Sequence, residues 1–87
     1  MRLYLNQSDI DKAINSMQDC DICTRCPIAQ LFKRKFHGKI TVGYITVKIN
    51  GTSKFYIKTG SKARKIVNMC TKDWHTIKPQ HLHFKEI

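Results

Sequence analysis

The sequence predicts an α+β fold in one compact domain spanning residues 1–87. We expect two N-terminal helices, an antiparallel β-hairpin extended to a small three- or four-stranded sheet, a third helix and a C-terminal strand. Two observations lead to this prediction. Apolar residues recur at helical spacing in three segments, and apolar residues alternate with polar ones on both sides of Asn50-Gly51. A chain of 87 residues buries only a modest core, so a bound metal would help to stabilise it.

The first predicted helix covers about residues 9–18. Ser8 is the expected N-cap, and Asp11 occupies the third helical position, where an acidic side chain favours a helix start. The apolar positions then recur at helical spacing: Ile10, Ala13, Ile14 and Met17.

The second predicted helix begins at Cys26 or Pro27, because a first helical residue can lack a backbone N–H. Gly38 is expected to end it. One face of this helix is apolar, with Ile28, Leu31, Phe32 and Phe36. The other face carries Lys33, Arg34 and Lys35.

The segment 39–50, KITVGYITVKIN, alternates as a strand but changes parity at Gly43-Tyr44. The alternation therefore predicts a bulge or tight bend at Gly43. Asn50-Gly51 is a strong hairpin signal and predicts a second strand over residues 54–58. The residues expected to face the core of this hairpin are Ile45, Val47, Ile49, Phe55 and Ile57.

Ser61 is the expected N-cap of a third helix. Its apolar side is formed by Ala63, Ile66, Val67 and Cys70. Residues 77–87 then alternate around two apolar positions, Leu82 and Phe84, which predicts a last strand.

Three cysteines follow a C-x2-C-x2-C pattern at Cys20, Cys23 and Cys26. In one interpretation they bind a structural zinc ion, with Cys70, His37 or His75 as the fourth ligand, because C-x2-C is a common spacing for two zinc thiolates. In a second, Cys23 and Cys26 form a redox pair at a helix N-terminus. In a third, Cys26 and Cys70 are small buried hydrophobic residues. The predicted metal ligands are Cys20, Cys23, Cys26 and Cys70.

The run CPIAQLFKR, followed by ITVGYITVKIN, a helix with a basic face and a short apolar C-terminal strand, resembles a family of small bacteriophage proteins. The resemblance extends from about Ile10 to Phe84, and its distinctive motif is Cys26-Pro27-Ile28-Ala29 with Arg34. The chain has Trp74-His75 where the family usually has Phe-Asp, and its segment KTGSKARKI is more basic. The resemblance implies a phage origin and a role in the host cytoplasm during infection, and it supplies no catalytic residue.

Sixteen Lys and Arg against six Asp and Glu give a formal net charge of +10. Such a charge indicates an acidic partner, either nucleic acid or an acidic host protein, although solubility alone is another explanation. A membrane span requires about 20 consecutive apolar residues, and no segment of the sequence approaches this length. We therefore expect no membrane partner.

If the hairpin buries its apolar series, the opposite face carries Tyr44, Thr46, Lys48, Lys54, Tyr56 and Lys58. Aromatic rings among cations are typical of surfaces that bind single-stranded nucleic acid, but the same residues are also common on the wet side of ordinary sheets. The two basic helix faces extend the prediction. The predicted nucleic-acid-binding residues are Lys33, Arg34, Lys35, Tyr44, Lys48, Tyr56, Lys58, Lys62, Arg64 and Lys65.

We therefore expect a small basic, non-enzymatic binding protein that acts on nucleic acid. Four of the six carboxylates lie in or near the first helix, and no Ser, His and Asp grouping has a recognisable catalytic spacing. Two alternatives remain open: a host-directed inhibitor of a bacterial defence or transcription protein, and a protein that sequesters small nucleotides. His81 and His83 share one face of the last strand, where they either chelate a metal or simply face solvent.

Overall fold

The computed structural model describes residues 1–16, 25–69 and 71–87. Along the chain lie β1 (Arg2–Leu5), α1 (Gln7–Asn15), α3 (Pro27–Lys35), β2 (Ile40–Val42), β3 (Thr46–Ile49), β4 (Thr52–Tyr56), α4 (Lys62–Asn68), the 3-10 helix η1 (Thr71–Thr76), β5 (Gln80–His83) and β6 (Lys85–Glu86). The predicted α+β class with antiparallel strands is confirmed. The predicted order is wrong at its start, because strand β1 precedes the first helix.

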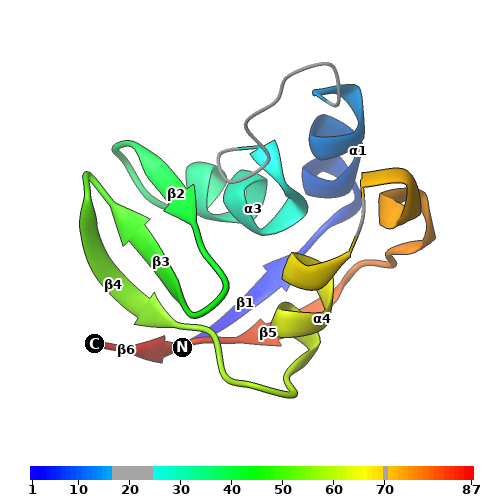
Figure 1. Cartoon of the computed structure of the whole chain (residues 1–87). Coiled ribbons are helices and arrows are strands. Elements are labelled where there is room, and N and C mark those ends of the chain that lie inside the picture. The colour runs from blue at the N-terminus through cyan, green and yellow to red at the C-terminus, as the bar shows by residue number, and fades with distance from the viewer. Residues whose placement is uncertain (17–24, 70) are drawn as a thin grey trace.

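The strands form a two-stranded sheet, β1-β5, and a four-stranded sheet in the order β2-β3-β4-β6. The expected single C-terminal strand is thus divided between the two sheets, and the chain crosses between them at Phe84. Both chain ends lie close together where the sheets meet (Figure 1). There the amino nitrogen of Met1 donates a hydrogen bond of 2.6 Å to the carbonyl of Phe84, and the amide of Phe84 donates one of 2.8 Å to the carbonyl of Met1.

The parity change at Gly43-Tyr44 marks a reversal of the chain. Residues 43–45 form a loop that joins β2 to β3, and Ile40 pairs with Ile49 and Val42 with Val47 in antiparallel register. Of the two predicted alternatives, the bulge within one strand is therefore wrong and the tight bend at Gly43 is confirmed, with the Gly43 amide donating a hydrogen bond of 2.9 Å to the Thr46 carbonyl. Because Ile45 belongs to the loop, its side chain is 61% exposed, and the prediction that it faces the core is wrong as well.

The turn at Asn50-Gly51 connects β3 to β4 as predicted, although β4 spans Thr52–Tyr56 and not the predicted residues 54–58. Both turn residues have positive φ angles, 54° and 82°, which suit a two-residue hairpin turn. The Asn50 side chain accepts a hydrogen bond of 2.9 Å from the amide of Lys39. The register shifts between Val47 and Lys48, so the bulge in this sheet lies on β4 at Lys54.

Short-range signals set the helix starts. Cys26 caps α3, since its Sγ accepts a hydrogen bond of 3.4 Å from the amide of Ala29, and Pro27 is the first helical residue, as predicted. Ser61 caps α4, also as predicted. The predicted Ser8 cap is wrong: α1 starts earlier, because Asn6 and Asp9 form a reciprocal capping box.

The core lies between the helices and the inner faces of both sheets. Helix α3 contacts α1, α4, β1 and β2, so it forms the centre of the fold (Figure 1). The ring of Phe32 on α3 lies 4.9 Å from that of Phe84 and 5.3 Å from that of Phe55, centroid to centroid. One side chain thus links the helix layer to the strand segments of both sheets. Within the described residues, no helix has the length and apolar character needed to cross a membrane.

Candidate nucleic-acid interface

The strand register places a tyrosine and two lysines on the solvent side of the four-stranded sheet. Val47 and Phe55 pair directly and are buried, so the neighbouring pair, Thr46 and Tyr56, lies on the opposite face. Tyr56 is 43% exposed. On its other side it pairs with Lys85 of β6. Lys48 is exposed on the same outer face, across the ladder from Thr41.

Lys85 is a residue that the sequence reasoning missed. It reaches the outer face because β6 pairs with β4, and only the tertiary pairing determines this position. The alternation of residues 82–85 indicated this position, because Leu82 and Phe84 are buried and Lys85 therefore points outward. Glu86 pairs with Phe55 and therefore belongs to the other face of the sheet. Lys85 therefore adds a positive charge to the outer face of the sheet, while the negative charge of Glu86 lies on the inner face.

A second tyrosine extends this surface toward α4. Tyr44 lies in the loop between β2 and β3 and is 65% exposed. The guanidinium carbon of Arg64 lies 5.7 Å from the centre of the Tyr44 ring, within the range of a cation–π contact. The loop and α4 are neighbours in Figure 1. The structure therefore joins one residue of the predicted α4 patch to the hairpin.

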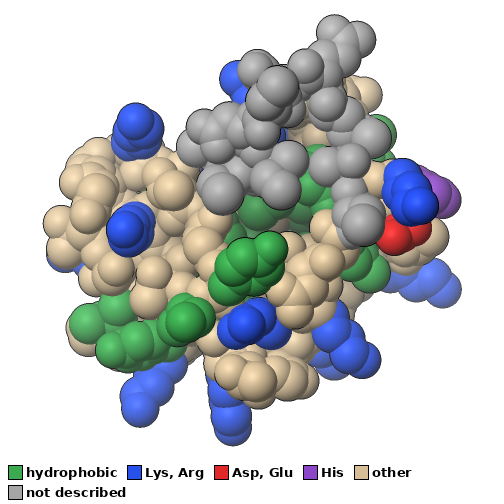
Figure 2. Space-filling model, in the orientation of Figure 1, with side chains coloured by type: hydrophobic (Ala, Val, Ile, Leu, Met, Phe, Trp, Pro, Cys, Tyr) green, Lys and Arg blue, Asp and Glu red, His purple; other side chains and the backbone are tan. Residues whose placement is uncertain are grey.

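We define the hairpin face by six residues: Tyr44, Lys48, Tyr56, Lys58, Arg64 and Lys85. Lys58 is exposed just beyond the end of β4, and Lys62 and Lys65 are exposed on α4 nearby in the sequence. Lys and Arg side chains are spread over the region of the hairpin and α4 in Figure 2, whereas acidic ones are scarce.

The positive charge is unevenly distributed along the chain. No Asp or Glu occurs between Asp21 and Asp73, whereas most of the 16 Lys and Arg lie in that segment. The segment contains both hairpins and α4. Cations without intervening acids add their potentials, which attracts a polyanion from a distance.

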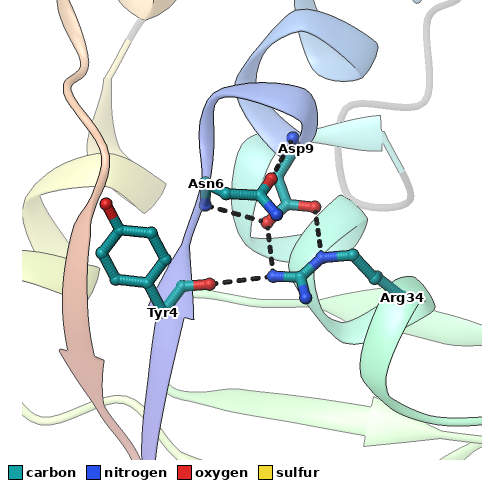
Figure 3. A network of polar contacts seen from close by, with 4 residues as sticks. All are labelled: Tyr4, Asn6, Asp9 and Arg34. Atoms are coloured by element: carbon teal, nitrogen blue, oxygen red, sulfur yellow. Dashed lines mark hydrogen bonds and ion pairs between the residues drawn. The ribbon is translucent and has the colours of Figure 1, made fainter.

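Arg34, a predicted nucleic-acid-binding residue, has its guanidinium in an internal network (Figure 3). Its Nε donates to Asp9 Oδ1 at 3.0 Å, and its Nη2 donates to Asp9 Oδ2 at 3.0 Å and to the Tyr4 carbonyl at 2.9 Å. Hydrogen bonding to Asp9 is the largest effect and raises the pKa of Arg34; burial lowers this pKa by less, and the charge of Asp9 raises it by less still. We therefore leave Arg34 out of the interface. Lys33 and Lys35 are exposed on the same helix, and no hydrogen bond or ion pair joins them to the hairpin face defined above within the described residues.

The zinc prediction concerns residues that lie largely outside the described part of the chain. Cys20, Cys23 and Cys70 are not described. Cys26 is buried, with its sulfur capping α3, while His37 and His75 are exposed. Among residues 1–16, 25–69 and 71–87, no group of three or more His, Cys, Asp or Glu is placed to hold a metal. Zinc binding stays a prediction.

His81 and His83 lie on the exposed face of β5. Their partners across the β1-β5 ladder are Tyr4 and Arg2. The Tyr4 and His81 rings meet edge to face, with centroids 4.8 Å apart.

Two features of the hairpin face can act together on a ligand. The exposed rings of Tyr44 and Tyr56 offer flat surfaces for stacking, and the lysines and Arg64 offer charge for phosphates. Each comes from a different element, so the surface depends on the fold.

Comparisons with protein-family models, with curated proteins and with solved structures find no match for the chain, so its own surface geometry and charge are what indicate a function.

Proposed function

We propose that this chain is a non-enzymatic protein that binds single-stranded nucleic acid through the hairpin face. The observation that carries the proposal is the position of Tyr56. It lies on an exposed sheet surface between Thr46 and Lys85, with Lys48 on the same face. The ring stacks on a base while the lysines pair with the flanking phosphates.

Single strands fit this surface better than duplexes. Exposed tyrosine rings on a sheet can stack only on bases that are not already stacked in a duplex. Reading a duplex groove commonly uses a basic helix or ribbon inserted into it. The basic face of α3 is weakened for that purpose, because Arg34 is held by Asp9.

The biological setting follows from the resemblance of Cys26-Pro27-Ile28-Ala29 with Arg34 to small bacteriophage proteins. We place the protein in the cytoplasm of an infected host, where it binds phage or host nucleic acid. The formal net charge of +10 supports a polyanionic partner there.

The test is binding of a fluorescent single-stranded oligonucleotide, measured by anisotropy. The variant Tyr56→Ala/Lys58→Ala removes one ring and one cation from the hairpin face. The matched control is Tyr4→Ala/Lys12→Ala, because Tyr4 and Tyr56 have similar exposures, 44% and 43%, and Tyr4 belongs to the other sheet. We expect the first variant to weaken binding by about tenfold or more and the control to bind nearly as the wild type does. Equal binding by both variants would refute the assignment to this surface.

A second candidate function is supported by Ile45, which is 61% exposed beside Tyr44. An exposed aliphatic and an aromatic side chain at a loop tip, surrounded by cations, also suit an acidic protein surface. The protein would then be a host-directed inhibitor of a defence or transcription protein. Capture of partners from host lysate after nuclease treatment separates the two functions, since a partner protein retained without nucleic acid favours the inhibitor.

A further inference from the structure

An apolar hollow of about 100 Å³ lies between the β2–β3 loop, α4 and η1. Its described walls include Val42, Tyr44, Ile66, Val67, Met69 and Trp74. Because Tyr44 is largely exposed, the hollow reaches the surface next to the hairpin face.

Trp74 in the wall of this hollow and Arg64 beside its Tyr44 wall each have a buried donor that lacks an acceptor within the described part of the chain. The side chain of Trp74 is only 2% exposed, and its indole Nε1 is buried without a hydrogen-bond partner. The Nε of Arg64 is also buried and unpaired, while its guanidinium lies over the Tyr44 ring that forms one wall. Buried donors are normally paired, so each of these two can take an acceptor from a bound ligand.

We propose that the hollow takes one pyrimidine base of the bound strand. Trp74 Nε1 donates a hydrogen bond to a base carbonyl, Tyr44 packs against the ring, and Arg64 pairs with the adjacent phosphate. An apolar occupant would leave both donors unpaired, whereas a nucleotide supplies an acceptor and an anion. This inference rests on the proposed function and names the part of the ligand that is recognised.

The size of the hollow favours a single ring over a purine. A closed apolar cavity of about 150 Å³ accommodates benzene. The hollow here is about 100 Å³, so a six-membered ring enters by its edge and remains partly outside. A two-ring purine would leave a larger part of its surface outside the hollow. We therefore expect oligothymidylate to bind better than oligoadenylate.

Trp74 provides a direct reporter, because the chain contains a single tryptophan. The experiment titrates the protein with oligothymidylate and with an abasic oligonucleotide of the same length, which keeps the phosphates and lacks the bases. Anisotropy of labelled strands measures binding, and tryptophan emission measures occupation of the hollow. We expect oligothymidylate alone to quench or shift the emission of Trp74.

The outcomes separate this inference from the proposed function. If oligothymidylate binds but changes the emission no more than the abasic strand does, the hollow takes no base and this inference is wrong, while binding through the hairpin face stands. If neither strand binds, both proposals fail.

A variant that fills the hollow gives an independent check. Val67 lines the hollow and is only partly buried, so Val67→Phe is expected to block it. Affinity for oligothymidylate should fall by about tenfold, and affinity for the abasic strand should not change. An unchanged preference for oligothymidylate in a folded Val67→Phe protein would overturn the inference. If Val67→Phe does not fold, Val67→Met obstructs the hollow less and allows the same comparison.

Discussion

Arg34 and Asp9, 25 positions apart in the sequence, form a two-point ion pair in which both contacts measure 3.0 Å. Asp9 is fully buried and also accepts a hydrogen bond of 3.2 Å from the backbone amide of Asn6 (Figure 3). The pair ties α3 to the capping box that starts α1, and Arg34 reaches the β1 backbone through the Tyr4 carbonyl. A residue within a basic run thus has a structural role.

Removal of the Arg34 charge should destabilise the protein. Arg34→Met retains most of the aliphatic stem but leaves the Asp9 carboxylate buried without its cation. We expect the free energy of unfolding to fall by about 3 kcal/mol. This value is at the lower end of the range for breaking a buried ion pair, because Arg34 is partly exposed. Urea denaturation measures it, with Lys33→Met on the same helix as the control. A loss in Arg34→Met no larger than that in the control would contradict this role.

The stabilisation by Arg34 should not depend on pH in the alkaline range. Hydrogen bonding to Asp9 raises the pKa of the Arg34 guanidinium. A group with a raised pKa in the folded state stabilises the protein fully below its ordinary pKa and loses that contribution only as the pH rises through the folded value. The stability difference between wild type and Arg34→Met should therefore be constant from about pH 7 to about pH 10. A difference that shrinks across this range in urea denaturation would disprove the expectation.

Two glycines with positive φ should respond differently to alanine. Gly51 has a φ of 82° and open space around it, so Gly51→Ala is expected to lose about 1 kcal/mol through backbone strain. At Gly38, where φ is 114°, a Cβ would lie 2.7 Å from Asn50 Oδ1, the atom that accepts from the Lys39 amide. Gly38→Ala should therefore lose about 1 kcal/mol more, because that hydrogen bond is broken as well. Thermal or urea unfolding of both variants tests the order, and an equal loss would argue against the Asn50 contact.

The salt dependence of binding should identify the lysines that touch phosphates. Each cation that neutralises a phosphate contributes about 0.7 to the slope of log affinity against log salt for single strands. We expect Lys48→Ala and Lys85→Ala each to reduce that slope by about this amount, whereas Lys12→Ala on α1 leaves it unchanged. Anisotropy titrations over a series of salt concentrations provide the slopes. If Lys85→Ala behaves as Lys12→Ala does, β6 is not part of the interface.

The cysteine cluster is tested by metal content. If Cys20, Cys23, Cys26 and Cys70 bind zinc, native mass spectrometry should show a mass excess of one zinc ion that acidification removes, because protonated thiols release the metal. Cys26→Ser would then lose the ion although serine can still cap α3. A bare native mass would leave Cys26 with the capping role and would exclude the zinc site.

Features that depend only on neighbouring residues were predictable from the sequence. The start of α3 at Cys26-Pro27, the turn at Asn50-Gly51 and the Ser61 cap were all predictable, because a helix start or a tight turn is decided within a few residues. The excess of positive charge was also predictable, because it follows directly from the composition. The alternation at residues 43–45 left two interpretations, a bulged strand or a tight bend, and the predicted inward position of Ile45 failed because the structure has the bend.

The tertiary structure sets which of the basic residues lie near one another and near the tyrosines. It joined Lys85 to Tyr56 through the β4–β6 pairing, brought Arg64 over Tyr44 and directed Arg34 inward to Asp9. These contacts join residues that are far apart in the sequence. Their positions depend on strand register and helix packing, which the pooled burial of many side chains determines.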